Sequence, residues 1–377
     1  MSGLYGKCKI RRFVHASMLV RAKPSEYRVC MSTVFLVGPT AVGKSAVAIE
    51  LAKRLNAEIL SADSMQVYRG MDIGTAKPTT AERATVPHHM LDIVDITEPF
   101  DVKQYVNYFA TVVSKLSAAR KTVIVVGGTG LYVRALRRGL FEGPGSNPKL
   151  RAKLEVMSTE TLYAELQRVD PKTAARIDRH NPRRLVRALE VFHSTGRPIS
   201  ELQAEWSVGQ PSRLSTRTGS STATDRRDAC PTGFCLNRDR ADLYSRIERR
   251  IDEQIAAGWV EEVRQLMEQG LEKNPTAMQA AGYRELVDYI RAESGRPSPT
   301  GEFADTAGRA SEKPSHFESL PEVVAQIKTR TRQLARRQLT WFRREPGLVW
   351  VEVAPEEPPA RTAERLIQIG KENSATR

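Results

Sequence analysis

The residues with the clearest chemistry form one glycine-rich run, Gly38-Pro39-Thr40-Ala41-Val42-Gly43-Lys44-Ser45. It matches the phosphate-binding pattern G-x-x-x-x-G-K-[ST] at every fixed position. Glycines let the backbone wrap closely around a phosphate, and successive N–H groups at a helix N-terminus offer partial positive charge. Lys44 adds a full charge, and the Ser45 hydroxyl is a candidate Mg²⁺ ligand. The run predicts a phosphate or diphosphate site and leaves open which phosphate it holds.

Two further polar residues follow apolar runs of strand length. Enzymes that hydrolyse ATP usually end a second strand in an aspartate that helps to hold Mg²⁺. Here the apolar run 123–126 ends in Gly-Gly-Thr-Gly, which places Thr129 where that acid would stand and weighs against a motor ATPase. Asp63 follows Ser61-Ala62 and could be a general base, a turn residue or a helix cap. Spacing alone leaves these alternatives for Asp63 open.

Arginines gather in two later segments. Arg184 and Arg187 share one face of a helix that Asn181-Pro182 would begin, and the alternative to a binding role is an ordinary solvated face. Residues 327–344 hold seven Lys/Arg and no acid. Ile327, Leu334 and Trp341 recur there every seven residues and predict a buried stripe, so the basic residues beside it are candidate phosphate contacts.

The composition limits the possible functions. The chain has 377 residues, with 58 Lys+Arg against 44 Asp+Glu and a net charge of +14. The excess favours a polyanionic partner: nucleic acid, anionic lipid or a phosphorylated substrate. No apolar stretch approaches the roughly 20 residues that cross a bilayer. Four cysteines are too few for a disulfide scaffold, which indicates a reducing compartment, and the spacing of Cys230 and Cys235 is not that of a zinc site.

The elements that must position these residues alternate between strand and helix. Residues 33–37, 58–60 and 122–126 read as strands, and 45–55 has helical spacing. This alternation predicts an α/β fold, a P-loop NTPase-like parallel sheet flanked by helices. We expect that core to comprise residues 32–145 and parts of 233–350, with a helical, arginine-rich region over 146–207 to which the family resemblance given below assigns contact with tRNA.

The remaining segments are expected to lie outside the core. Residues 1–31 are basic and poor in acids: a disordered extension, a transit peptide, or sequence upstream of a true start at Met31. Residues 208–232 and 293–319 read as flexible insertions. Residues 351–377 read as a C-terminal tail, with a linker and one short helix from Pro355.

Several motifs taken together resemble the bacterial-type tRNA dimethylallyltransferases, also called isopentenyl-tRNA transferases. The resemblance spans about 33–350. Its carriers are the glycine-rich run 38–45 and the segments SADSMQVYRGMDIGTAKP (61–78), PHHMLD (87–92), GGTGLY (127–132), DPKTAARI (170–177), NPRRLVRALE (181–190), QAAGYRE (279–285) and TRQLARRQLTWFR (331–343).

The resemblance implies a reaction. That family transfers a dimethylallyl group from dimethylallyl diphosphate to N6 of adenosine 37, next to the anticodon of tRNAs that read codons beginning with U, and releases diphosphate. It implies that the glycine-rich loop, although of the ATP-binding type by motif, holds the diphosphate with Mg²⁺. It further implies a cytoplasmic monomer that binds the tRNA anticodon stem-loop, without a membrane. An organellar location is the alternative if residues 1–31 are a transit peptide.

The resemblance also implies roles for single residues. Asp63 would be the general base, Thr129 would donate to the oxygen that bridges allyl carbon and diphosphate, and Arg250 would contact the diphosphate. The residues expected to contact tRNA are Asp63, Ser64, Met65, Gln66, Thr129, Arg151, Arg183, Arg184, Leu185, Val186, Arg187, Gln279, Gly282, Tyr283 and Arg284.

Other functions compete with this interpretation. The glycine-rich run alone would suit a P-loop nucleotide or small-molecule kinase. A P-loop protein that binds RNA without catalysis is a third possibility. Adenylate isopentenyltransferases use free nucleotides, and the arginine-rich helical region argues for tRNA instead.

Overall fold

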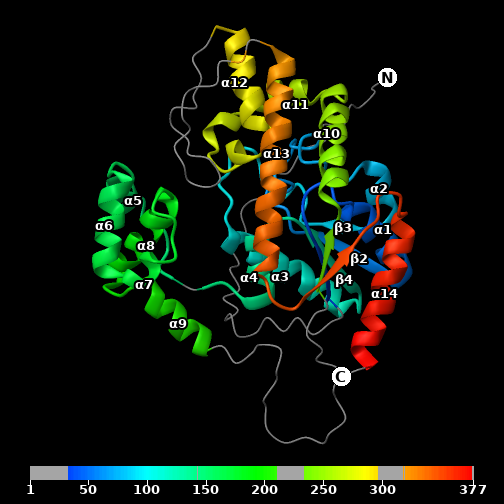
Figure 1. Ribbon diagram of the computed structural model, residues 1–377, viewed down its shortest axis with the longest axis horizontal. Coiled ribbons are helices and arrows are strands. Elements are labelled where there is room, and N and C mark those ends of the chain that lie inside the picture. Colours follow the sequence, from blue (N-terminus) through cyan, green and yellow to red (C-terminus); the bar gives the residue numbers. More distant parts are fainter. Residues whose placement is uncertain (1–32, 142, 210–232, 296–316, 318, 376–377) are drawn as a thin grey trace, which may run out of the picture.

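A six-stranded parallel sheet forms the centre of the molecule (Figure 1). The computed structural model describes residues 33–141, 143–209, 233–295, 317 and 319–375. The strand order is β3-β2-β4-β1-β5-β6. The strands are β1 (Thr33–Val37), β2 (Ala57–Ser61), β3 (His88–His89), β4 (Thr122–Gly127), β5 (Gly233–Asn237) and β6 (Leu348–Glu352). The predicted parallel α/β fold is confirmed, and β3, β5 and β6 are additions to it.

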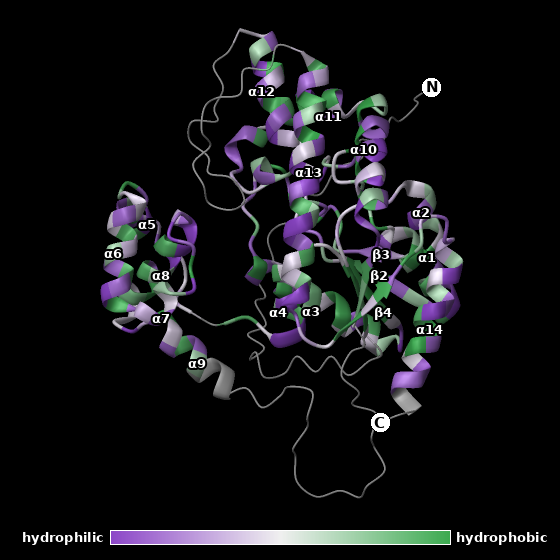
Figure 2. Ribbon diagram, viewed as in Figure 1, coloured by the Kyte–Doolittle hydropathy of each residue, from purple (hydrophilic) through white to green (hydrophobic). Residues whose placement is uncertain are grey.

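Helices cover the sheet on both sides, and Figure 2 shows hydrophobic residues concentrated in the strands between them. The flanking helices are α1 (Lys44–Leu55), α3 (Val102–Ala118), α4 (Gly130–Arg138) and α14 (Pro359–Ala375). The short helix α2 (Thr80–Thr85) buries none of its residues. Helix α14 packs along α1 and buries Ala363 and Leu366 completely or nearly so. The segment expected to be a tail with one short helix therefore supplies a 17-residue helix to the core.

A separate helical lobe stands beside the sheet domain (Figure 1). It contains α5 (Pro148–Glu155), α6 (Thr159–Val169), α7 (Pro171–Ala174), α8 (Pro182–Thr195) and α9 (Ile199–Gly209). The lobe has its own small core, in which Leu162, Leu166, Leu185 and Leu189 are at most 1% exposed. Helix α9 extends through Gly209, so the expected insertion 208–232 begins within a helix, and 210–232 lie outside the described residues.

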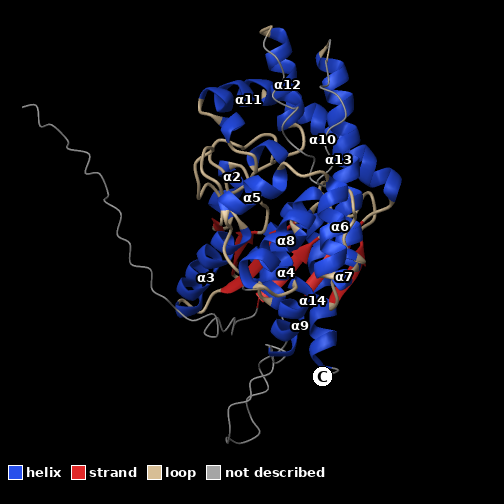
Figure 3. Ribbon diagram, turned by 90° about the vertical axis from the view of Figure 1, so that its left-hand side faces the viewer, coloured by secondary structure: helices blue, strands red, loops and turns tan. Residues whose placement is uncertain are grey.

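A second helical group rises above the carboxyl ends of the strands (Figure 3). It contains α10 (Arg240–Ala256), α11 (Trp259–Glu268), the short turns η2 (Leu271–Lys273) and η3 (Ala277–Gln279), α12 (Tyr283–Glu293) and α13 (Leu320–Arg343). The expected insertion 293–319 begins at the end of α12, and Phe317 packs against the core; 296–316 and 318 lie outside the described residues.

The buried face of helix α13 differs from the buried stripe predicted at Ile327, Leu334 and Trp341. Its buried residues are Val323, Ile327, Ala335 and Phe342. Leu334 and Trp341, which were expected in the buried stripe, line a cavity instead. None of the helices within the described ranges is long and apolar enough to span a membrane.

Candidate active site

The glycine-rich loop leaves β1 at the centre of the sheet and enters α1. Its backbone takes left-handed conformations at Ala41 (φ 62°) and Gly43 (φ 103°). A Cβ on Gly38 would lie 2.6 Å from the carbonyl oxygen of Leu236 in β5, so glycine is needed for this close approach. The loop therefore has the tight, N–H-rich shape that a phosphate site requires.

Two arginines hold the loop from outside. Arg238 donates to the carbonyl of Val42 at 2.9 Å, and Arg246 donates to the carbonyl of Ala41 at 3.0 Å. These bonds occupy two carbonyls of the loop and hold its backbone in place. No local sequence signal identifies either arginine, since their partners lie about 200 positions away.

Lys44 lies inside this loop, where its ammonium donates to the carbonyl of Pro39 at 2.6 Å. Burial and, next, the nearby charge of Arg250 lower the pKa of Lys44 to about 8. A negatively charged ligand would offset that shift, because its charge favours the protonated lysine. A buried lysine beside an arginine therefore suits an anion.

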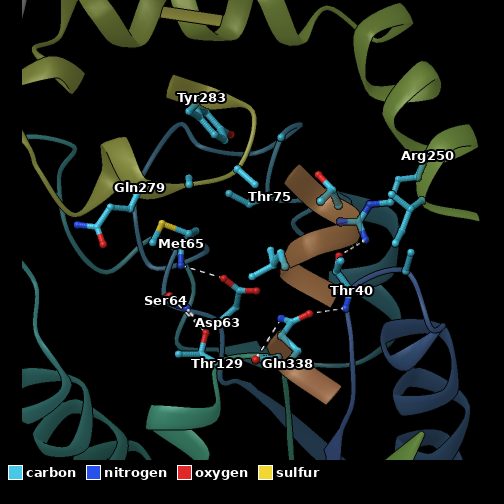
Figure 4. A pocket seen from close by; sticks show the side chains of 18 of the residues that line it. Thr40, Asp63, Ser64, Met65, Thr75, Thr129, Arg250, Gln279, Tyr283 and Gln338 are labelled. Carbon is cyan, nitrogen blue, oxygen red and sulfur yellow. Dashed lines mark hydrogen bonds between the residues drawn. The ribbon is translucent and has the colours of Figure 1, made fainter. Parts of the chain in front are cut away.

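Asp63 and Thr129 meet beside the loop because they follow β2 and β4, which are neighbours in the sheet. In Figure 4, Asp63 Oδ1 accepts a hydrogen bond from the Met65 amide (2.9 Å), and Thr129 Oγ1 accepts one from the Ser64 amide (3.0 Å). The turn role that the sequence left open for Asp63 is therefore present. The same carboxylate also borders both cavities described next.

Two adjoining cavities occupy the carboxyl ends of the strands. The smaller, of about 120 Å³, is lined by loop residues including Lys44 and Ser45 and by Gln66. The larger, of about 310 Å³, has mainly apolar walls from α10, α13 and the segment before α12. Residues that border both are Thr40, Asp63, Thr75, Gly128, Arg250 and Gln338. A charged chamber thus opens into a wider one, with a carboxylate at their junction.

Arg250 reaches this junction from α10. Its guanidinium donates to Thr40 Oγ1 at 3.4 Å (Figure 4). Burial lowers the pKa of Arg250, although a guanidinium keeps its proton under all ordinary conditions. The structure therefore brings the sequence-predicted arginine within reach of any anion that the loop holds.

Two tryptophans border the larger cavity. Trp259 is 1% exposed and packs in the core, yet it also lines the cavity. A Cβ on Gly74 or Gly282 would come within 2.1 or 2.0 Å of the Trp259 ring, so both glycines make room for it. Trp341, expected in the core, borders the cavity under the guanidinium of Arg134, 4.4 Å from the ring centroid.

The predicted RNA-contacting arginines lie mostly in the lobe. Arg184 is exposed on α8. Arg151 and Arg187 are half-exposed, and both pair with the fully buried carboxylate of Glu190 at 3.0 and 2.6 Å. That acid orients them toward one surface of the lobe.

Two of the residues predicted to contact tRNA form a hydrogen bond between the lobe and the rest of the molecule. Arg183 of α8 donates to the side-chain oxygen of Gln279 at 2.5 Å. Gln279 borders the larger cavity. A hydrogen bond therefore links the lobe to a residue that lines the larger cavity.

Three of the residues predicted to contact tRNA have buried side chains. The side chains of Leu185, Val186 and Arg284 are 0%, 3% and 6% exposed. Leu185 and Val186 lie on the face of α8 that packs into the lobe, so contact with tRNA stays a prediction for this segment of α8. Tyr283, although buried, borders the larger cavity and donates its hydroxyl to Glu262 at 2.6 Å.

Comparison with known proteins agrees with this geometry. The family model described as IPP transferase matches residues 66–345. The tRNA dimethylallyltransferase 1 of Trichlorobacter lovleyi is 40% identical over 320 residues, which cover 84% of this chain and 92% of that protein. The tRNA dimethylallyltransferase of Geobacter metallireducens is 42% identical over 324 residues, covering 85% and 92%.

Solved structures lead to the same family. The full-length tRNA isopentenylpyrophosphate transferase of Bacillus halodurans has a TM-score of 0.58 and 31% identity, covering 91% of this chain and 96% of that one. A eukaryotic dimethylallyltransferase described as acting on tRNA has a TM-score of 0.69 at 23% identity, covering 92% and 80%, and shares the fold. The sequence motifs, the glycine-rich loop at the end of β1 and these matches show that the chain belongs to the IPP transferase family.

Proposed function

We propose that the protein transfers a dimethylallyl group from dimethylallyl diphosphate to N6 of adenosine 37, beside the anticodon of tRNAs that read codons beginning with U, and releases diphosphate. The observation that carries the proposal is the position of Asp63 between an anion-binding loop and a cavity of about 310 Å³. The relatives named tRNA dimethylallyltransferase support the same reaction.

The loop residues would bind the diphosphate. The backbone N–H groups of the glycine-rich loop, Lys44 and Arg250 all suit phosphate oxygens. The Ser45 hydroxyl fits Mg²⁺, which prefers oxygen ligands and is commonly held by few protein groups together with substrate phosphates. Among the described residues no three His, Cys, Asp or Glu side chains gather as a metal site, so the diphosphate would supply most of the anionic ligands. When bound, Mg²⁺ would neutralise charge on the leaving diphosphate.

The reaction breaks the allylic C–O bond and forms a C–N bond. The electron pair of the breaking bond goes to the diphosphate, whose growing charge Lys44 and Arg250 stabilise. Thr129 donates to the bridging oxygen as that bond lengthens. The adenine N6 is a weak nucleophile because its lone pair is conjugated with the ring, and Asp63 takes its proton as the new bond forms.

The larger cavity would receive the adenine. A base must leave the anticodon-loop stack to enter a protein site, at a cost of a few kcal/mol that base and phosphate contacts recover. Ser64 and Met65 border the cavity next to Asp63 and are placed to contact this nucleotide. Exposed Arg184 and the basic face of α13 would contact RNA phosphates. We expect the enzyme to act as a cytoplasmic monomer.

Mass spectrometry of the modified nucleoside tests the proposal. The protein is incubated with tRNA that reads a codon beginning with U, dimethylallyl diphosphate and Mg²⁺. The expected product is one dimethylallyl group at adenosine 37, with release of diphosphate. ATP-dependent phosphorylation of a small substrate without RNA, and no transfer to tRNA, would instead identify a kinase. Tight tRNA binding without any transfer would identify a non-catalytic RNA-binding protein.

A further inference from the structure

Gln338, on the inner face of α13, lies where the two cavities meet (Figure 4). Its side-chain oxygen accepts a hydrogen bond from the backbone amide of Thr40 at 2.8 Å. Its side-chain nitrogen donates to the carbonyl of Gly128 at 3.1 Å. One amide therefore joins the glycine-rich loop after β1 to the turn after β4.

These two bonds belong to a longer chain of contacts. Thr40, held through its amide by Gln338, receives the guanidinium of Arg250 on its hydroxyl at 3.4 Å. Gly128 immediately precedes Thr129, whose amide donates to the carbonyl of Ala62 at 3.2 Å. The chain runs from the segment that carries Asp63, through Gln338, to the loop and Arg250.

The backbone makes space for this side chain. A Cβ on Gly128 would lie 2.4 Å from the Gln338 side-chain nitrogen. It would also lie 3.4 Å from the carbonyl oxygen of Gly38 in the loop. Three segments that are distant in sequence therefore meet at this amide, and the absence of a side chain at position 128 lets the amide enter.

We propose that Gln338 is a positioning residue that sets the spacing between the diphosphate-binding loop and Thr129. The inference rests on the proposed function, because that spacing matters only if the loop holds the leaving group and Thr129 donates to its bridging oxygen. A leaving group held slightly too far from Thr129 or Asp63 would still bind but would react slowly. A misplacement of about 1 Å can cost on the order of 100-fold in rate.

Replacement of Gln338 by methionine, which has similar length but neither bond, tests the proposal. The full-length protein is assayed with tRNA and dimethylallyl diphosphate, and kcat, both KM values and tRNA affinity are measured. We expect kcat to fall by about 10- to 100-fold, with tRNA affinity changed less than about twofold. The KM for dimethylallyl diphosphate should change less than kcat, because Lys44 and Arg250 remain. Gln333→Met, at an exposed position of the same helix, is the matched control.

Two further variants change the same hydrogen bonds in different ways. Gly128→Ala keeps Gln338 but pushes its amide away, so it should lower kcat in the same direction. Gln338→Glu keeps the acceptor for the Thr40 amide, but it loses the bond to the Gly128 carbonyl and adds a negative charge. It should therefore lower kcat and also raise the KM for dimethylallyl diphosphate. Melting temperatures are measured for all variants.

The outcomes separate the inference from the function on which it rests. Failure of the wild-type protein to transfer the group refutes the proposed function. Transfer by wild type together with an undiminished kcat in Gln338→Met and Gly128→Ala overturns the positioning role. Loss of folding in both variants, or an equal loss of kcat in Gln333→Met, also overturns it, in favour of a purely structural contribution.

Discussion

At the scale of single residues, a substitution at Asp63 should change the rate of transfer without changing the affinity for tRNA. Asp63 borders both cavities and accepts the Met65 amide through Oδ1. Asparagine offers an oxygen for the same bond and cannot take the N6 proton. For Asp63→Asn we expect transfer to fall by about 10²- to 10⁴-fold, with tRNA affinity nearly unchanged. Single-turnover transfer and filter binding measure the two quantities.

Glu268→Gln, at an exposed position on α11, is the control for the lost charge. It should transfer at the wild-type rate. Robust activity of Asp63→Asn would remove Asp63 from the role of base and leave it as the turn residue that its hydrogen bond shows.

Lys44 gives the site a pH dependence. Burial, followed by the charge of Arg250, holds its pKa at about 8 in the ligand-free protein. A bound diphosphate favours the charged form and raises that pKa, so binding at or above pH 8 should take up a proton. Well below pH 8 the lysine is already protonated, so Lys44 should take up no proton when the diphosphate binds. Affinity for dimethylallyl diphosphate should therefore weaken as the pH rises through 8.

Calorimetry in two buffers of different ionisation enthalpy measures this uptake. Lys44→Arg is the matched variant, because arginine stays protonated throughout the range. It should bind with less pH dependence above pH 8 than wild type. The same proton uptake in Lys44→Arg would assign the titration to another group, such as the diphosphate itself.

At the scale of helices and strands, local signals predicted part of the site. The glycine-rich run and the apolar residues 33–37 lie next to each other in sequence, so strand, loop and helix could be read together. Strand β5 has five residues, and its place is fixed by pairing with β1, as in Phe35 with Gly233. That pairing spans almost 200 positions and leaves no local signal.

Helix α13 shows a second limit. Its seven-residue spacing predicts one buried stripe, but its apolar residues divide between the core, as at Phe342, and the cavity, as at Trp341. Both surroundings favour the same residue types. The role of Gln338 could not be predicted for another reason. Its hydrogen bonds join it to residues 298 and 210 positions away, so no local pattern marks it.

In the helical lobe, a buried carboxylate on one helix fixes two arginines that are candidate tRNA contacts. Glu190 of α8 is fully buried and accepts from Arg151, from Arg187 and from the amide of Asn147 at 2.8 Å. Glutamine would keep the volume and weaken the charged bonds, so both arginines should lose their fixed orientation. For Glu190→Gln we expect tRNA affinity to fall about tenfold, which corresponds to ~1.4 kcal/mol. The kcat at saturating tRNA should stay within about twofold, because no group at the reacting atoms changes.

Glu155→Gln, at an exposed position on α5, controls for the removal of one negative charge. By charge alone it should bind tRNA as well as wild type or slightly better. An unchanged affinity in Glu190→Gln would mean that Arg151 and Arg187 serve the lobe and do not contact RNA.

At the scale of the whole molecule, the net charge of +14 is unevenly distributed. Residues 1–31 hold seven Lys/Arg against one acid, and 327–344 hold seven with none. In the latter segment, three members pair inside the molecule: Lys328 with Asp252, Arg330 with Glu285 and Arg332 with Glu248. The first half of α13 is thus largely neutralised. The charge available for RNA lies near its end, where Arg336, Arg343 and Arg344 are exposed.

This distribution predicts the salt dependence of tRNA binding. Each phosphate that a basic side chain neutralises adds about 0.7–0.9 to the slope of log affinity against log salt concentration. Removal of residues 1–31 should leave the slope unchanged, although it removes a net charge of +6. Joint replacement of Arg336, Arg343 and Arg344 by glutamine should lower the slope, by about 0.7–0.9 for each phosphate that the variant no longer neutralises. Lys328→Gln, which breaks a pair with Asp252, should leave it unchanged.

Titration of tRNA binding against salt, measured for the four proteins in one buffer, decides among these expectations. A smaller slope after removal of residues 1–31 would place RNA contacts in that segment and contradict the assignment to the end of α13. An unchanged slope in the triple variant would move the contacts to the lobe, where Arg184 is the exposed candidate. Because the slope counts phosphates rather than total charge, it distinguishes a basic surface that binds RNA from one that merely carries charge.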